Sequence, residues 1–232
     1  LAALAPGAEI EIVKEIPIPF VPTPTDVSPY VGLVPPEAET IFYLYPSPAV
    51  SKLLNFDMAA RGLTEKPRVA PVPAIEGTPL YDPAFLETLE GTYVHELLPL
   101  NTADFDTDFT KAFRGKLGTA DDNSEIGNPA NIATMKAYMV WEDLFLFKEA
   151  AEEVNYQSKA DYPQLVEALE GRTMSESLEH PQGTKIMRDK DHQMFTRTWL
   201  SVVENGKIRA KYTIPLEKNE YIPTVDFTTE TL

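Results

Sequence analysis

The sequence contains no cysteine among its 232 residues. Disulfide bonds, thiolate zinc sites and cysteine nucleophiles are therefore excluded together. Long hydrophobic runs are also missing, since no stretch reaches the roughly 18 apolar residues that cross a bilayer as a helix. The sequence thus offers no candidate for a membrane-spanning helix.

Positive charge is scarce. The chain has 20 Lys and Arg residues against 36 Asp and Glu residues, a formal net charge of −16. A protein that binds nucleic acid needs a basic face to displace counterions from the phosphate backbone. The average surface of this chain instead repels phosphate groups and anionic lipids, and we exclude nucleic acid as a partner.

The usual signatures of catalysis are missing as well. The sequence has no G-x-S-x-G elbow, no G-x-x-x-x-G-K-[ST] phosphate loop and no G-x-G-x-x-G dinucleotide turn. We therefore expect a protein that binds a ligand without changing it, with no catalytic residue and no cofactor. An acidic α/β hydrolase whose catalytic residues follow no known motif stays open as an alternative.

The chain has only three histidines, and two of them lie in the stretch HPQGTKIMRDKDHQ. His192 could join Asp189, Asp191 or His180 around a divalent metal. The spacing matches no helical metal motif, however, and no residue nearby would orient the ligands. A polar turn is therefore favoured over a metal site, and His95, in a predicted strand, is expected to have a packing role.

What the chain does contain is 43% hydrophobic residues, enough for a packed core. Near the start, Ile10, Ile12 and Ile16 alternate with acidic residues, which predicts a half-buried strand. The apolar run from Ile41 to Tyr45 predicts a strand buried on both faces, as in a parallel sheet.

A helix is predicted directly after this run. Ser47 suits the N-cap and Pro48 the first helical position, while Gly62 can end the helix in a left-handed conformation. Two more short strands are predicted in KPRVAPVPAI and GTYVHELLPL, with a short helix, DPAFLETLE, between them. This β-α-β order predicts an open, doubly wound α/β sheet with its ligand just beyond the carboxyl ends of the strands.

The later part of the chain is predicted to be mainly helical. A long helix begins at Asn128 and Pro129, and apolar residues cover so much of its circumference that we expect it to be deeply buried. A second, amphipathic helix ends at Gly171. Two strands joined through Asn205 and Gly206 then form a hairpin, because Asn-Gly is the strongest short hairpin signal.

Four segments resemble one known family when they are taken in order along the chain. They are PGAEIEIVKEIPIPFVPTPTDVSPYV, ETIFYLYPSPAVSKLLNFDMAARGL, the long helix followed by VEALEG, and KIMRDKDHQMFTRTWLSVVENGKI. Their order and spacing resemble the type I periplasmic solute-binding proteins of ABC importers, and more narrowly the branched-chain amino acid and amide-binding branch. The T-D-x-S-P, A-A-R-G-L and R-D-x-D-H-Q motifs carry the resemblance.

The resemblance implies two doubly wound lobes joined by a hinge. Residues 1–98 and 199–232 would form lobe two, and residues 99–198 would form the later, helical part of lobe one. Family members usually begin with a βα segment of on the order of a hundred residues, a typical domain size, that has no counterpart here. The resemblance therefore implies that the N-terminal part of lobe one is missing from this sequence.

The resemblance also implies a site and partners. Contacts with the ligand from lobe two would come from Tyr45 or Ser47 and from the loop holding Ala74 and Glu76. The ligand would be a small polar solute such as an amino acid or amide, and the other partners would be an importer permease and the missing N-terminal segment. The protein would be periplasmic or otherwise extracytoplasmic, and a ligand-sensing receptor module of the same fold remains an alternative.

Overall fold

The computed structural model describes residues 10–71, 82–99, 107–117 and 135–229. The chain divides into two compact units. Unit 1 comprises residues 1–95, 124–131 and 201–209, and unit 2 comprises residues 96–123, 132–200 and 210–232. The assignment of these units to the two lobes of a solute-binding protein stays a prediction.

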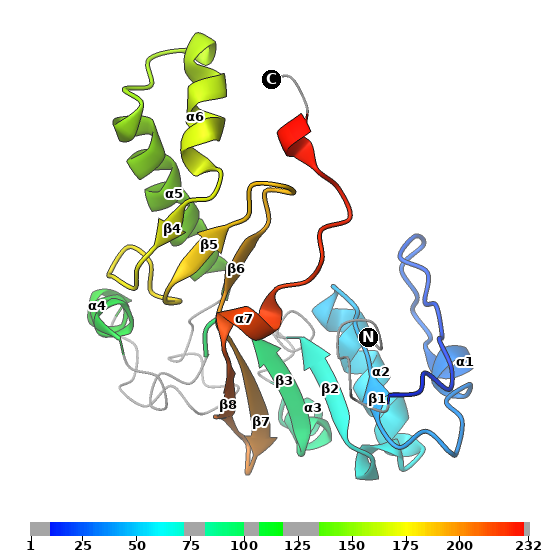
Figure 1. Ribbon diagram of the computed structural model, residues 1–232. Helices are drawn as coiled ribbons and strands as arrows, with labels where there is room; N and C mark the ends of the chain where they lie inside the picture. The colour runs from blue at the N-terminus through cyan, green and yellow to red at the C-terminus, as the bar shows by residue number, and fades with distance from the viewer. Residues whose placement is uncertain (1–9, 72–81, 100–106, 118–134, 230–232) are drawn as a thin grey trace. The chain divides into compact units, whose positions relative to one another are not determined.

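Unit 1 begins with a repeated strand and helix order (Figure 1). Strand β1 is paired in parallel with β2, and β2 in parallel with β3. Helix α2 packs against both α1 and α3. The elements are α1 (Ser28–Val31), β1 (Ile41–Phe42), α2 (Pro48–Ala60), η1 (Leu63–Glu65), β2 (Arg68–Pro71), α3 (Pro83–Leu89) and β3 (Thr92–Glu96).

The sequence signals at the ends of α2 and at the start of α3 predicted these helices correctly. Pro48 is the first residue of α2, and Gly62 follows the helix with a φ of 69°, the left-handed conformation expected there. Asp82 caps α3, where its side chain accepts a hydrogen bond from the backbone N–H of Ala84 at 3.0 Å. The α/β class and the parallel pairing of the first three strands are therefore confirmed.

Two strand predictions in unit 1 are wrong. Residues 10–19 form no regular structure, and Ile10 and Ile12 are exposed. No strand among the described residues pairs with this segment, and a strand without hydrogen-bonding neighbours is not stable. Strand β1 is buried on one face only: Tyr43 and Tyr45, just beyond it, are buried, whereas Phe42 is 58% exposed. The reason is that β1 is the edge strand of its sheet.

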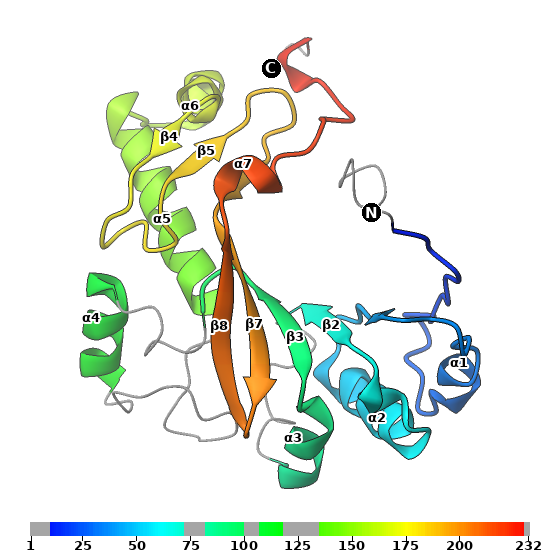
Figure 2. The same cartoon turned by 60° about the horizontal axis from the view of Figure 1, so that its bottom comes forward.

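Strands β7 (Thr198–Glu204) and β8 (Lys207–Ile214) form the predicted hairpin. Asn205 and Gly206 link them with φ angles of 54° and 69°, as a type I′ turn requires. Figure 2 shows this hairpin as two long adjacent ribbons. The five-stranded sheet has the order β1-β2-β3-β7-β8.

Unit 2 contains a second sheet that the sequence did not predict. Its strands are β4 (Thr173–Met174), β5 (Lys185–Met187) and β6 (Met194–Thr196), paired antiparallel in that order. Strands of two or three residues are too short to show a period-two pattern in the sequence. The helices are α4 (Asp108–Leu117), α5 (Met135–Glu153), η5 (Lys159–Asp161), α6 (Tyr162–Leu169), α7 (Leu216–Asn219) and η6 (Phe227–Thr229).

The core of unit 2 forms around α5. Leu98, Phe109, Tyr138 and Trp199 form one buried apolar cluster. The rings of Phe109 and Tyr138 meet edge to face, with centroids 5.1 Å apart, a favourable geometry for aromatic pairs. Helix α6 packs against α5 and ends before Gly171, whose φ is 69°, as predicted.

The prediction that the long helix is deeply buried is wrong for α5. Its predicted start at residues 128–134 lies outside the described residues. Within Met135–Glu153, Tyr138, Leu146 and Ala150 are buried, but several large apolar side chains on other sides of the helix are exposed. In the parts of the chain that the structure describes, no helix is both long and apolar enough to span a membrane.

Candidate functional site

The predicted ligand site lies where the parallel strands of unit 1 end. Ile41 pairs with Arg68 and Phe42 with Val69, so β1 and β2 run in register and in the same direction. Their carboxyl ends therefore lie at one edge of the sheet, the edge at which open α/β sheets bind ligands. Two residues separate the end of β1 at Phe42 from the predicted site residue Tyr45.

Tyr45 is buried, and its side chain is already engaged. Its hydroxyl donates a hydrogen bond to the carbonyl oxygen of Pro19 at 2.9 Å. Its ring lies 6.1 Å from that of Phe20, measured between centroids. Its carbonyl oxygen accepts a hydrogen bond from the Ser51 hydroxyl at 3.4 Å. Tyr45 thus holds the segment around residues 19–20 in place within unit 1, and its part in ligand binding stays a prediction.

Ser47 occupies the predicted N-cap of α2, but its hydroxyl does not cap the helix. The Ser47 carbonyl accepts the N–H of Ser51 at 3.0 Å, whereas its side chain forms no hydrogen bond with any described residue. The side chain is half-buried. A hydroxyl without an internal partner, next to the positive end of a 13-residue helix, can donate to or accept from a polar group of a ligand.

Ala74 and Glu76 lie outside the described residues. Strand β2 ends at Pro71, three residues before Ala74 in the sequence. Their part in the site stays a prediction.

A buried arginine that was not predicted from the sequence anchors β2 to neighbouring elements. Arg68 donates hydrogen bonds to the carbonyl oxygens of Thr88 at 2.5 Å and Glu90 at 2.6 Å, and to the side-chain oxygen of Asn55 at 3.2 Å. Burial lowers the pKa of its guanidinium. These bonds join β2 to the end of α3 and to α2, and so fix the strand that leads toward the predicted loop.

The turn between β5 and β6 contains the RDKDHQ motif. The guanidinium of Arg188 donates to the Asp191 carboxylate with an Nε–Oδ1 distance of 2.7 Å, and the Arg188 N–H donates to the Gln193 carbonyl at 2.8 Å. His192 has a φ of 53°, and its Nε2 lies 2.8 Å from a carboxylate oxygen of Glu170. Among the residues that the structure describes, no three acidic or histidine side chains could hold a metal ion.

The same turn fastens the C-terminal segment. Arg188 lies over the rings of Phe195 and Tyr221, at 4.6 Å and 5.0 Å from the ring centroids, and donates to the Tyr221 carbonyl. Further along, the N–H of Phe227 donates to the Lys190 carbonyl at 2.6 Å. The motif therefore has a structural role, close to the polar turn that the sequence favoured.

A buried ion pair in unit 2 was also missed. Glu142 of α5 and Lys185 of β5 form a salt bridge with side chains 4% and 2% exposed. The N–H of Gln182 donates to Glu142 at 2.9 Å, and Lys185 donates to the Gln182 side chain at 3.0 Å. Burial raises the pKa of Glu142 in spite of Lys185, and burial lowers the pKa of Lys185.

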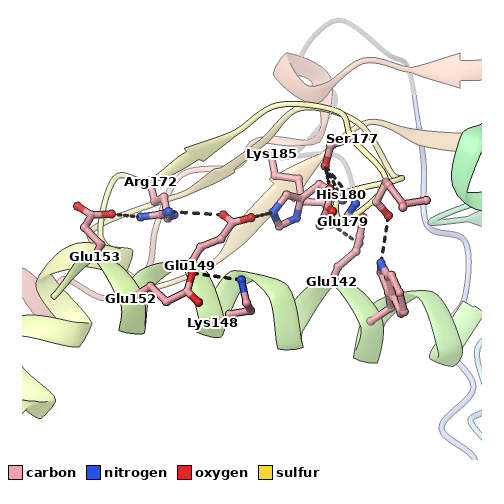
Figure 3. A network of polar contacts seen from close by, with 12 residues as sticks. Glu142, Lys148, Glu149, Glu152, Glu153, Arg172, Ser177, Glu179, His180 and Lys185 are labelled. Carbon is pink, nitrogen blue, oxygen red and sulfur yellow. Dashed lines mark hydrogen bonds and ion pairs between the residues drawn. The ribbon is translucent and has the colours of Figure 1, made fainter. Parts of the chain in front are cut away.

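Figure 3 shows that this pair belongs to a row of contacts along α5. The Nε2 of His180 lies 3.0 Å from a carboxylate oxygen of Glu149, and Arg172 bridges Glu149 and Glu153 at 3.5 Å and 2.6 Å. The row ties the loop between β4 and β5 to the helix. The hydroxyl of Ser177 belongs to the same row, since it accepts the N–H of His180 at 3.1 Å, and these contacts position the loop on the helix.

No protein-family model and no curated protein sequence matches the chain. Solved structures do match its fold. One is a solute-binding protein of an ABC transporter from Rhodopseudomonas palustris HaA2 in complex with p-hydroxybenzoic acid, with a TM-score of 0.64 and 18% identity over 83% of this chain and 50% of that one.

Two other solved structures support the same fold. A solute-binding protein of an ABC transporter from Rhodopseudomonas palustris BisB5, in complex with 3,4-dihydroxybenzoic acid, has a TM-score of 0.58 and 14% identity over 82% of this chain and 49% of that one. A leucine-binding protein from Thermotoga maritima MSB8 has a TM-score of 0.55 and 15% identity over 83% of this chain and 49% of that one. The chain therefore has the type I periplasmic-binding-protein fold and spans about half the length of these structures.

Proposed function

We propose that this chain is part of an extracytoplasmic solute-binding protein that captures a small polar solute between two lobes and delivers it to the permease of an ABC importer. In this role the protein holds the solute and leaves it chemically intact. Closure of the lobes around the solute shifts the population toward the closed state, because only that state makes contacts from both sides. The missing part of lobe one would come from an N-terminal segment of the same protein.

The observation that carries the proposal is the parallel pairing of β1 and β2. It implies that their carboxyl ends share one edge of the sheet, and Ser47, whose side chain bonds to no described residue, follows the end of β1 by five residues in the sequence. This is the position at which open α/β sheets hold ligands. The fold of the chain, found in solute-binding proteins, supports the same reading.

The solute we propose is an amino acid, an amide or a related compound. Ser47 would contact its polar groups, and the loop with Ala74 and Glu76 would contact it from the neighbouring strand. If the solute carries an ammonium group, Glu76 would form a charge-assisted hydrogen bond with it, worth about 1.5–3 kcal/mol.

The test is a thermal-unfolding screen of the whole protein against amino acids, amides, urea and small aromatic acids. A solute at about 100 times its Kd should stabilise the folded state by about 2.7 kcal/mol, and so raise the Tm by about 5 °C or more. Ser47→Ala should reduce the shift, whereas Ser175→Ala, at an exposed position of unit 2, should not. If no solute in the panel moves the Tm, the proposed role is wrong.

A further inference from the structure

Helix α5 carries a second apolar face that the described residues of its own unit leave half exposed or more, although the ring of Phe147 meets that of Tyr156 with centroids 6.2 Å apart. Val140, Leu144 and Phe147 follow one another at helical spacing and form one stripe, here called the outer stripe. They are 59%, 63% and 50% exposed. A helix at the surface of a globular protein normally presents charged and polar residues on this side.

The opposite face of α5 already has its partners. Tyr138 packs in the apolar core, Glu142 pairs with Lys185, and Glu149 contacts His180. The outer stripe is therefore not a displaced part of this core. It is a second surface, and burying side chains of this size away from water is strongly favourable.

The share of the fold that this chain covers indicates what packs against the outer stripe. The chain matches 50% and 49% of the lengths of two solved structures with this fold. About half of each structure therefore has no counterpart in this chain. In α/β folds, a helix buries its apolar stripe against a sheet. A second copy of the chain is a poor candidate, because two proteins with a net charge of −16 repel each other.

We propose that the outer stripe of α5 binds the polypeptide segment that supplies the other half of the two-lobed fold, and that this segment contacts it with an apolar sheet face. The inference rests on the proposed function, since it takes the complete protein to have two lobes. It also explains why α5 is apolar around so much of its circumference: both faces are buried in the complete protein.

The test uses a photo-crosslinking residue, p-benzoylphenylalanine, at position 144 in the protein expressed in its source organism. The matched control is the same residue at position 152, because Glu152 lies on the same helix, has a side chain that is 64% exposed and forms a surface ion pair with Lys148. Mass spectrometry then identifies the crosslinked peptide. We expect position 144 to crosslink to a segment whose sequence matches the first half of a type I solute-binding fold, and position 152 to crosslink at least about tenfold less.

Three results would overturn the inference: a crosslink from position 144 to a second copy of this chain, a crosslink to a protein without that fold, or no more product than at position 152. A second variant guards against misfolding. Leu144→Glu should reduce association with the segment by about tenfold or more, because it would bury an unpaired charge. Its circular dichroism should stay unchanged, since the side chain is mostly exposed in this chain.

The outcome is separable from that of the proposed function. A specific crosslink at position 144 in a protein that binds no solute would keep this interface and reject solute capture. Solute binding by a protein without the crosslink would do the reverse.

Discussion

At the scale of single residues, the least expected feature is the buried pair of Glu142 and Lys185. Burial alone disfavours the charged form of each side chain, which is why the pKa of Glu142 is raised and that of Lys185 is lowered. The pair is tolerated because Gln182 supplies a hydrogen bond to each partner. Such a pair holds β5 and its loop in one position on α5.

Removing one partner should be costly. Lys185→Met leaves an unpaired carboxyl in the core and should lower the free energy of unfolding by about 3–5 kcal/mol at pH 8. Lys148→Met is the matched control, since Lys148 and Glu152 form an exposed pair on the same helix, worth about 0.5 kcal/mol or less. Urea unfolding followed by tryptophan fluorescence measures both, because the only two tryptophans, Trp141 and Trp199, lie in unit 2.

The effect of Lys185→Met should depend on pH with a definite sign. The pKa of Glu142 is higher in the folded than in the unfolded protein, so folding favours its protonated form. The contribution of protonated Glu142 to stability is thus fully present below the ordinary glutamate pKa of about 4.3. It is lost as the pH rises through the raised pKa of Glu142 in the folded protein. The loss should be smaller at pH 5 than at pH 8, and an equal loss at both values would contradict a buried carboxyl.

Residue-level predictions succeeded where the signal was local. The position of Ser47 before α2 and the left-handed Gly62 follow from cap preferences, which depend on a few neighbouring residues. The burial of Arg68 and Glu142 could not be predicted, because each is buried by partners far away in the sequence: Thr88 for Arg68, and Lys185 for Glu142. The hydrogen bond from the Tyr45 hydroxyl to the Pro19 carbonyl could not be predicted for the same reason.

At the scale of elements, the turn between β5 and β6 binds the C-terminal segment and holds it in place. Arg188 connects three parts: Asp191 in its own turn, Phe195 on β6 and Tyr221 in the segment after α7. The hydroxyl of Tyr221 also donates to the Gln193 side chain at 3.0 Å. The segment therefore depends on one guanidinium for several of its contacts.

Arg188→Ala should release this segment. Amide hydrogen exchange of residues 216–229 should become at least about tenfold faster, since hydrogen bonds and ring contacts of a charged group are lost together. Lys190→Ala is the control, because Lys190 is half exposed and lies 3.7 Å from Asp226, so its loss should change exchange little. Unchanged protection in Arg188→Ala would show that the turn does not hold the segment.

Low pH should release residues 216–229, as Arg188→Ala does. The hydrogen bond from Arg188 lowers the pKa of Asp191, so folding favours the ionised carboxylate. Its contribution is present above the ordinary aspartate pKa of about 3.9 and is lost as the pH falls through the lowered value. Protection of residues 216–229 should therefore persist at pH 5 and disappear in stronger acid.

Elements were predictable in proportion to the strength of their local pattern. The β7–β8 hairpin and α2 were predicted because Asn205-Gly206 and the Ser-Pro start are strong signals. The strand predicted at residues 10–16 failed, although its alternation is clear, because a strand also needs a neighbour, which no pattern within it reveals. The short strands β4 to β6 have too few residues to show any period.

At the scale of the whole molecule, the order of the elements carries most of the information. The β-α-β order predicted a parallel sheet, and β1, β2 and β3 form one. The exposed stripe on α5 and the single buried face of β1 could not be predicted, because patterning tells which side chains favour burial but not which polypeptide covers them. Both are apolar surfaces on a chain that spans about half of the fold it matches.

In the function proposed here, the protein binds a solute and leaves it chemically unaltered. The most direct measurement is calorimetric titration of the whole protein with the solute that raises the Tm most, followed by recovery of that solute for mass spectrometry. We expect a saturable isotherm with about one site per protein and a solute of unchanged mass. A solute that returns converted to another compound, or an absence of saturable heat, would contradict it.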